Sequence, residues 1–189
     1  MIRIGVLGDI GSGKSFVAKS FGYPVFDADK EVARLYKNNK KVFKKLKKIL
    51  PKYIFSFPIK KSEIIKAILA NRNNLKKIVH IVHVEVRKKM ILFLKKNKNK
   101  KLVILDIPLL LENKINKKKD ILVFVQSKRL DIEKRLKKRI GFNESMIKNF
   151  KKIQLSLDYK EKISQFVIKN NFRKKTVKQD VQNILKRIL

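Results

Sequence analysis

Short apolar runs recur along the chain and alternate with longer stretches in which apolar residues return at the spacing of a helix. The runs cover residues 2–7, 25–26, 102–105, 121–125 and 166–168. The third and fourth runs are continuously apolar, which is typical of parallel strands buried on both faces of a sheet. The pattern predicts a short β-strand at each of the five positions.

Helices are predicted between these strands, where apolar residues recur every three or four positions. Such patterns cover residues 30–48 and 74–96, with a shorter helix over 62–70 for which we expect Ser62 as the N-cap. One or two strongly basic helices are predicted between 127 and 152. A C-terminal helix is expected to follow the last strand.

The alternation of strands and helices predicts an α/β fold built on a doubly wound parallel sheet. Residues 31–100 contain no clear strand, so we expect them to form a helical insertion beside the sheet. The chain has 189 residues, which is the length of one domain, and it contains no long linker. We therefore expect a single domain over residues 1–189.

The segment between the first strand and the helix after it carries the clearest chemical signal. Residues 8–15 read Gly-Asp-Ile-Gly-Ser-Gly-Lys-Ser and fit the pattern of a phosphate-binding P-loop. Glycines let the backbone approach a phosphate, Lys14 supplies positive charge to the terminal phosphates, and the Ser15 hydroxyl can ligate Mg²⁺. We expect a bound nucleoside triphosphate, held by Gly8, Gly11, Ser12, Gly13, Lys14, Ser15 and Phe16.

Three aspartates follow predicted strands. Asp106 ends the strand at 102–105, where P-loop proteins place the acid that helps to hold Mg²⁺. Asp27 and Asp29 follow the strand at 25–26, and strand-like alternation would turn both carboxylates toward one cleft. One of them could then orient Mg²⁺ while the other accepts a proton from an attacking hydroxyl. The alternative is that these acids only form turns.

Arginine is scarce in this chain, so an arginine pair is more informative than any cluster of lysines. Arg135 and Arg139 are four residues apart, which places them on one face of a predicted helix. Guanidinium groups suit a phosphoryl group in transfer, and a solvated helix face is the alternative. The only histidines are His80 and His83, and no other soft ligands accompany them, so we expect no metal site there.

The formal net charge of +35 admits two interpretations. Such a charge normally indicates a nucleic-acid or anionic-membrane partner. However, 41 of the 50 basic residues are Lys, and Lys, Ile and Asn are encoded by A/T-rich codons, so a mutational bias accounts for this composition without any polyanion. Because the lysines are spread along the chain, we favour a solvated lysine-rich surface and no specific nucleic-acid partner.

Other features of the composition narrow the class of protein. The chain has no cysteine, which excludes disulfides and thiol chemistry. No apolar run approaches 18 residues, so we expect no transmembrane helix and no membrane partner. The N-terminal residues show no signal-peptide pattern, which favours a cytoplasmic protein.

Taken together, these segments resemble the dephospho-CoA kinase family from residue 4 to about residue 170. Residues 5–15 resemble its glycine-rich opening, and Asp27-Ala28-Asp29 matches its Asp-Ala-Asp triplet. Residues 106–112 resemble its Asp-x-Pro-Leu-Leu-Phe-Glu block. Other positions that match the family pattern are His80, Arg135, Arg139, Gln154, Lys160 and the segment from Phe166 to Asn170.

The resemblance implies a five-stranded P-loop core, a helical acceptor-binding region at about 31–100 and a mobile lid at about 127–152. It implies ATP-dependent phosphorylation of the ribose 3′-hydroxyl of dephospho-CoA, with ATP and Mg²⁺ as cofactors, a small-molecule partner and, as we favour, a monomer. The implied site residues are Lys14, Asp29, Arg135 and Arg139 for catalysis, Asp29 and His80 for the acceptor, and Ser15, Asp27 and Asp106 for the metal.

The chain departs from the family pattern at several positions. Asp9 replaces a usual glycine and brings negative charge near the phosphate site, which would weaken ATP binding unless the carboxylate points outward. Phe16 replaces a usual Thr, Ile81 replaces the Pro after His80, and Ser164-Gln165 replaces Ala-Asp. None of these changes removes a residue with an expected chemical role.

Two other functions stay open at this point. One is a P-loop kinase for another small acceptor, such as a nucleoside monophosphate. The other is a non-catalytic nucleic-acid-binding protein, which we rank last because the chain has no Trp and few clustered aromatic residues on which bases could stack.

The charge interpretation predicts how the protein behaves toward DNA. Binding to duplex DNA should be weak, indifferent to sequence and steeply dependent on salt, because only phosphate contacts contribute. A titration of DNA fragments at several salt concentrations measures this. A sequence-specific site that survives high salt would overturn the view that the charge reflects codon usage.

Overall fold

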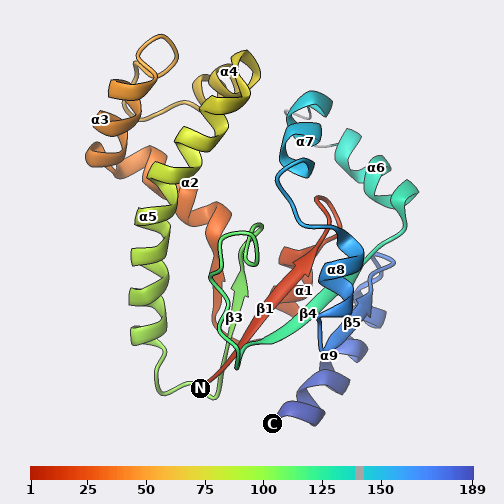
Figure 1. Ribbon diagram of the computed structural model, residues 1–189. Helices are drawn as coiled ribbons and strands as arrows, with labels where there is room; N and C mark the ends of the chain where they lie inside the picture. The colour runs from red at the N-terminus through yellow and green to blue at the C-terminus, as the bar shows by residue number, and fades with distance from the viewer. Residues whose placement is uncertain (139–142) are drawn as a thin grey trace. The chain divides into compact units, whose positions relative to one another are not determined.

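A computed structural model describes residues 1–138 and 143–189 of the chain (Figure 1). The chain divides into two compact units. The first unit comprises Met1–Asp27, Asn97–Asn143 and Lys151–Leu189, and the second comprises Ala28–Lys96 and Glu144–Phe150.

The first unit is built on a five-stranded sheet with the strand order β2-β3-β1-β4-β5. Every neighbouring pair in this sheet is parallel. The parallel sheet confirms the predicted α/β fold, and all five predicted strands are present. Their bounds are β1 Ile2–Gly8, β2 Val25–Asp27, β3 Leu102–Asp106, β4 Ile121–Gln126 and β5 Phe166–Lys169.

Two helices cover one face of the sheet, α1 (Lys14–Ser20) and α9 (Lys174–Ile188) (Figure 1). Their apolar residues pack with inward side chains of the strands in a core that is almost fully buried. The core contributors from the helices and the C-cap of α1 are Val17, Ala18, Phe21, Val177, Val181 and Ile184, and those from the strands are Ile4, Val6, Leu102, Ile104, Val123, Val125 and Ile168.

The other face of the central strand β1 is closely packed at Gly5. A Cβ atom placed on Gly5 would lie 2.5 Å from Leu110 Cδ2 and 3.1 Å from Leu122 Cδ2. A side chain at this position would therefore displace Leu110, which belongs to the segment after β3. The absence of a side chain at Gly5 lets this segment lie directly against β1.

Helix α8 (Leu157–Lys162) was not predicted from the sequence. It has six residues, and the one that is fully buried is a lysine, so no apolar periodicity marks it. Its N-cap is Ser156, whose side chain accepts a hydrogen bond from the Tyr159 N–H. The basic helices expected between 127 and 152 are α6 (Arg129–Lys137) and α7 (Glu144–Lys151), and the expected break at Gly141 lies outside the described residues.

The second unit contains α2 (Ala28–Asn38), α3 (Lys40–Ile49), α4 (Lys61–Ala70) and α5 (Arg72–Lys96). The single helix predicted over 30–48 is wrong, because the helix breaks at Asn39. The side chain of Asn39 accepts a hydrogen bond from the Val42 N–H at 3.0 Å and so caps α3. An asparagine that bonds the following backbone competes with helix continuation.

The prediction of Ser62 as an N-cap is also wrong. Helix α4 begins at Lys61, and its N-cap residue is Lys60, which makes no capping hydrogen bond through its side chain. The buried Glu63 instead accepts hydrogen bonds from the Phe55 N–H and from the Ser56 N–H and hydroxyl. The carboxylate in the first turn thus ties the preceding loop to the helix.

Two charged pairs are buried inside the first unit. Arg3 on β1 contacts the Asp120 carboxylate at 2.9 Å, and Asp120 also accepts from the Lys117 N–H. Lys160 on α8 contacts Glu112 Oε1 at 2.7 Å, and the same oxygen accepts from the Leu155 N–H. Both pairs link segments that are distant in sequence. Across residues 1–138 and 143–189, no helix is long and apolar enough to cross a membrane.

The Lys160–Glu112 pair predicts a large effect on stability. Lys160→Met should lower the free energy of unfolding by about 3–5 kcal/mol, because it leaves a buried carboxylate without its cation. Chemical denaturation of the purified variant measures this. Lys162→Met, an exposed position on the same helix, is the matched control and should stay within about 0.5 kcal/mol of the original chain.

Replacing both partners, as Lys160→Met with Glu112→Gln, should recover part of the loss because no charge is then buried alone. Equal losses for the Lys160 and Lys162 variants would show that the buried pair makes no special contribution.

Candidate active site

The P-loop joins the end of β1 to the start of α1, and its glycines have backbone angles that other residues rarely adopt. Gly11 has φ +87° and Gly13 has φ +90°. A Cβ atom on Gly11 would lie 3.0 Å from Ile132 and Leu136 of α6, while one on Gly13 would collide with the Asn170 side chain. Glycine is therefore required at both positions by conformation and by space.

The carbonyl of Ser12 fixes the loop to the ends of two neighbouring strands. It accepts a hydrogen bond from Asn170 Nδ2 at 2.8 Å and another from the Ser127 hydroxyl at 2.9 Å. Asn170 follows β5 directly and is 2% exposed, and Ser127 follows β4. Asn170 also accepts from the Phe172 N–H through its Oδ1, so its amide is held at both ends.

Sequence reasoning gave no role to Ser127 or Asn170. Both lie directly after predicted strands, and the carboxyl ends of adjacent parallel strands meet at one edge of a sheet. A polar residue directly after a predicted strand was the sequence feature that could have marked each of them as a site residue. However, only the strand order β1-β4-β5 shows that these two residues lie beside the P-loop.

Lys14 closes the loop on itself. Its ammonium group donates hydrogen bonds to the carbonyls of Asp9 at 2.7 Å and Gly8 at 3.2 Å. The positive charge is thus held at the centre of the loop, where N–H groups of the first turn of α1 can also face an anion. Two other residues expected to bind nucleotide, Ser15 and Phe16, are exposed at the start of this helix.

The two predicted metal-site acids lie next to each other. Asp27 and Asp106 are paired residues at the carboxyl ends of β2 and β3. Asp106 is 5% exposed, and burial raises the pKa of its carboxyl group, with the nearby Asp27 charge adding to the rise. A hydrogen bond with the Ser15 side chain, together with the charge of Lys14, opposes the rise in this pKa.

This arrangement fits a divalent cation. Ionising a buried carboxyl group beside a second carboxylate is unfavourable, and a cation held near the two carboxylates would relieve this cost. Residues 1–138 and 143–189 contain no group of three or more His, Cys, Asp or Glu that could hold a metal alone. That is compatible with Mg²⁺, which is usually bound through one or two carboxylates together with substrate phosphates and water.

Asp29 and His80 belong to the second unit. Strand β2 ends at Asp27, so Asp29 lies in the first turn of α2 and is exposed. The expectation that strand alternation turns Asp27 and Asp29 the same way is therefore wrong, because the backbone is helical at Asp29. His80 is exposed on α5. The roles expected for Asp29 and His80 stay predictions.

The expected lid arginines are only partly described. The Arg135 guanidinium lies 4.2 Å from the centre of the Phe172 ring, which is a cation–π contact. Helix α6 ends at Lys137, and Arg139 lies outside the described residues. The predicted helical pairing of Arg135 and Arg139 thus stays a prediction, as does their role in phosphoryl transfer.

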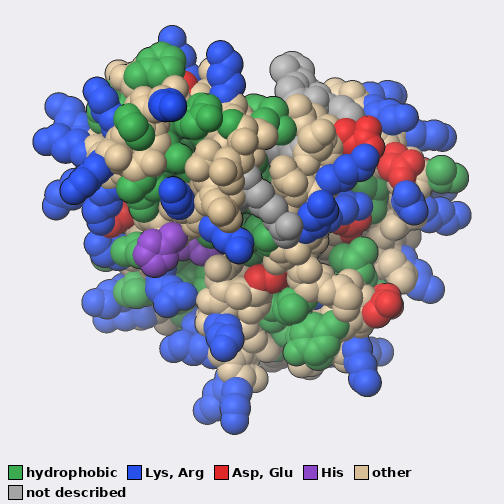
Figure 2. Space-filling model, turned by 45° about the horizontal axis from the view of Figure 1, so that its top comes forward, with side chains coloured by type: hydrophobic (Ala, Val, Ile, Leu, Met, Phe, Trp, Pro, Cys, Tyr) green, Lys and Arg blue, Asp and Glu red, His purple; other side chains and the backbone are tan. Residues whose placement is uncertain are grey.

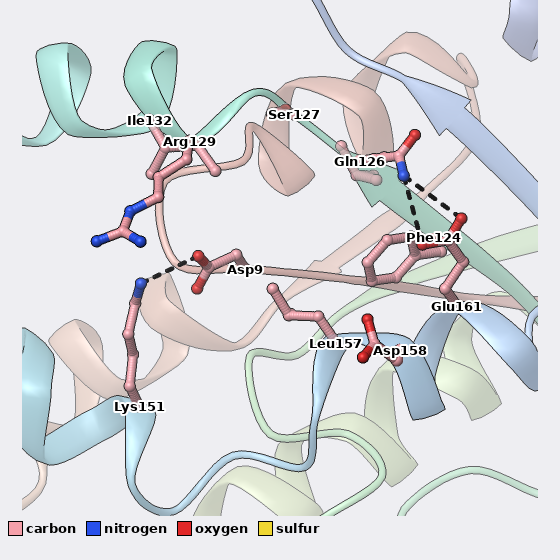
Figure 3. Close-up of a pocket in the computed structure, with 11 residues that line it drawn as sticks. Asp9, Phe124, Gln126, Ser127, Arg129, Ile132, Lys151, Leu157, Asp158 and Glu161 are labelled. Atoms are coloured by element: carbon pink, nitrogen blue, oxygen red, sulfur yellow. Dashed lines mark hydrogen bonds and ion pairs between the residues drawn. The ribbon is translucent and has the colours of Figure 1, made fainter.

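A pocket of about 460 Å³ adjoins the P-loop inside the first unit. Figure 3 shows Asp9 at one side of it, with the Lys151 side chain reaching the Asp9 carboxylate. On its other side, the Gln126 amide donates to Glu161 of α8 at 3.4 Å. The carboxylate that departs from the family pattern therefore faces this pocket.

Basic side chains are scattered over the face of the molecule shown in Figure 2. They are interspersed with apolar and polar groups and with occasional acids. The view matches lysines that are spread along the sequence.

Comparison with known proteins gives a consistent result. The family model described as dephospho-CoA kinase matches residues 2–176. A relative named dephospho-CoA kinase from Wolbachia pipientis is 35% identical over 187 residues, which cover 96% of this chain and 95% of the relative.

Solved structures show the same fold. The crystal structure of a Thermus thermophilus protein has a TM-score of 0.75 and 25% identity, with 100% of this chain and 98% of that chain covered. A dephospho-CoA kinase from Campylobacter jejuni has a TM-score of 0.62 and 21% identity, with 98% and 96% covered. The second likeness concerns the fold alone.

The contacts of Asn170 predict that it stabilises the P-loop. Asn170→Ala should lower the free energy of unfolding by about 1–3 kcal/mol, because two backbone partners lose a buried hydrogen bond. Denaturant titration measures the change. Asn183→Ala, at an exposed position of α9, is the control and should change stability by no more than about 0.5 kcal/mol. Equal stabilities for the two variants would contradict a fixing role for Asn170.

Proposed function

Because the chain belongs to the dephospho-CoA kinase family, we propose that its P-loop holds the triphosphate of ATP and that Ser15, Asp27 and Asp106 hold the accompanying Mg²⁺. The reaction is ATP-dependent phosphorylation of the ribose 3′-hydroxyl of dephospho-CoA, the final step of coenzyme A biosynthesis. The enzyme is a kinase with a small-molecule substrate, and a nucleoside monophosphate is not favoured as the acceptor.

One observation carries the proposal for the site. The side chains of Ser15 and Asp106 share a hydrogen bond. Asp106 is also the register partner of Asp27 across two parallel strands, at the end of the sheet where the P-loop begins. The hydroxyl, the two carboxylates and the Lys14 ammonium are the groups that a P-loop kinase uses around the phosphates and their metal. When bound, Mg²⁺ would neutralise charge that develops on the phosphates.

The proposed nucleotide-binding residues act through the backbone and one cation. N–H groups of Gly11, Gly13 and the start of α1 would face the phosphates, as the glycine conformations permit, while the Ser12 N–H donates to the Asp9 carbonyl within the loop. Lys14 would exchange its bonds to the Gly8 and Asp9 carbonyls for bonds to phosphate oxygens. Ser127 and Asn170 would keep their hydrogen bonds to the Ser12 carbonyl, so the loop would keep its shape during this exchange.

We propose Asp29 as the general base. In the transfer, the acceptor oxygen forms a bond to the γ-phosphorus as the bond to the leaving ADP oxygen breaks, and the hydroxyl proton passes to a carboxylate. Asp29 is two residues from Asp27, so its Cα atom lies within about 7 Å of that of Asp27 whatever the local conformation. Asp106 is less suited to this role because its carboxylate would be occupied by the metal.

The remaining residues act on the acceptor and on the moving phosphoryl group in this proposal. Arg135 and Arg139 would stabilise negative charge on the phosphoryl group, and His80 would bind the acceptor. Residues of about 31–100 would form the acceptor-binding region, and those of about 127–152 would form the lid. We also propose a cytoplasmic monomer without a specific nucleic-acid partner.

A panel of acceptors with Mg-ATP tests the reaction. Dephospho-CoA should be phosphorylated far faster than any nucleoside monophosphate. Lys14→Ala should abolish transfer without unfolding the chain, because the lysine charge serves the phosphates rather than the core. Activity of this variant within tenfold of the original chain would contradict a catalytic P-loop, and preference for a nucleoside monophosphate would contradict the acceptor.

The role of Asp29 predicts a loss in the chemical step. Asp29→Asn should lower kcat by roughly 10²–10⁴ with ATP affinity nearly unchanged, because a proton acceptor is lost while the shape is kept. Single-turnover transfer and a separate measurement of ATP affinity distinguish the outcomes. Near-normal transfer would exclude Asp29 as the base, and lost ATP affinity would place it beside the metal instead.

A further inference from the structure

We propose that Lys151 is a positioning residue for nucleotide binding: it holds and neutralises the Asp9 carboxylate, which would otherwise repel the phosphates at the P-loop. This inference rests on the proposed binding of ATP to that loop. It concerns a pair of residues within the first unit, one in the P-loop and the other at the end of α7.

Asp9 lies in the phosphate-binding loop, one residue after Gly8. Its side chain is 14% exposed, so it is not a carboxylate that extends freely into solvent. One carboxylate oxygen, Oδ1, accepts a hydrogen bond from the Ile10 N–H at 2.6 Å. The carboxylate is thus fixed against the loop that is expected to receive a polyanion.

The second carboxylate oxygen faces Lys151. The Lys151 Nζ lies 3.2 Å from Asp9 Oδ2, within ion-pair distance, and Figure 3 shows the lysine reaching across the pocket to this oxygen. Lys151 stands far from Asp9 in sequence, so the pair depends on the fold. The fold thus brings a cation to Asp9, the one acidic side chain of the P-loop, and the sequence alone could not show this pairing.

Two other cations lie near Asp9, but each has a different role in the structure. Lys14 donates to the backbone carbonyls of Gly8 and Asp9, from which it is well placed to turn to phosphate. Arg129 also lines the pocket, and its Nε donates to Glu133 at 2.8 Å. Of these three cations, Lys151 is the one that forms an ion pair with the Asp9 carboxylate.

The effect on nucleotide binding follows from Coulomb's law. A carboxylate a few ångströms from several phosphate charges lowers affinity, and a cation in contact with that carboxylate cancels most of its field at longer range. The lysine is 48% exposed, so water and salt weaken the interaction without removing it. The pair would add little to stability. Its consequence is that the P-loop keeps a net positive charge.

A double-mutant cycle separates this role from a direct contact between Lys151 and ATP. The variants are Asp9→Asn, Lys151→Met and the combination of both, because asparagine keeps an acceptor for the Ile10 N–H and methionine keeps the length of the lysine chain. ATP affinity is measured by calorimetry, and KM for ATP and kcat are measured in the transfer assay. Lys152→Met, the adjacent exposed lysine, controls for the loss of one positive charge.

Lys151→Met should weaken ATP binding by roughly three- to tenfold and raise KM with kcat retained, because an unneutralised carboxylate then stands beside the phosphates. Asp9→Asn should bind ATP at least as tightly as the original chain. The double variant should return to within about twofold of Asp9→Asn alone, since Lys151 has nothing left to neutralise. The difference between the single and double variants should shrink as salt is raised.

Three outcomes overturn the inference. If the double variant binds ATP as weakly as Lys151→Met, then Lys151 contacts the phosphates directly. If Lys151→Met binds ATP like the original chain, then the ion pair has no effect on nucleotide. If Lys152→Met gives an equal loss, then only the general charge matters. Absence of ATP binding by the original chain would instead contradict the proposed function, so the two failures are distinguishable.

Discussion

Parallel pairing of β1 with β3 on one side and β4 on the other is the constraint on which the candidate site depends. Parallel strands end at the same edge of a sheet, so the P-loop after β1 shares that edge with the residues that follow the other strands. Asp106 and Asp27 reach it through β3 and β2. Ser127 and Asn170 reach it through β4 and β5. The two acids proposed to hold the metal and the supports of the loop thus lie on opposite sides of one central strand.

A buried ion pair joins segments of the first unit, although most lysines of this chain are exposed. The Lys160–Glu112 pair attaches α8 to the segment that follows Asp106, and Glu112 also receives the Leu155 N–H. The same segment places Leu110 against Gly5 in β1. Acids are few in this chain, and Glu112 is one whose contacts join three parts of the first unit: α8, the residues before it and the segment after β3.

Local sequence patterns were sufficient for the strands, the P-loop and the Asp106 position, because each depends on residues that are neighbours in the chain. The features that were missed depend on other kinds of contact. Asn39 breaks a helix through a side-chain bond that competes with a continuous apolar pattern. Helix α8 buries a lysine, which periodicity cannot detect. The bonds of Ser127 and Asn170 to the Ser12 carbonyl require the strand order, which no local pattern contains.

The bonds that Lys14 makes to two carbonyls of its own loop bear on the entropy of ligand capture. A flexible glycine-rich loop would have to lose conformational freedom each time a ligand arrived, and that loss would be subtracted from affinity. Here the Lys14 ammonium joins two carbonyls of the loop, which restricts the backbone before any ligand arrives. Under the proposed function, ATP binding would then be an exchange of hydrogen-bond partners at a preorganised cation.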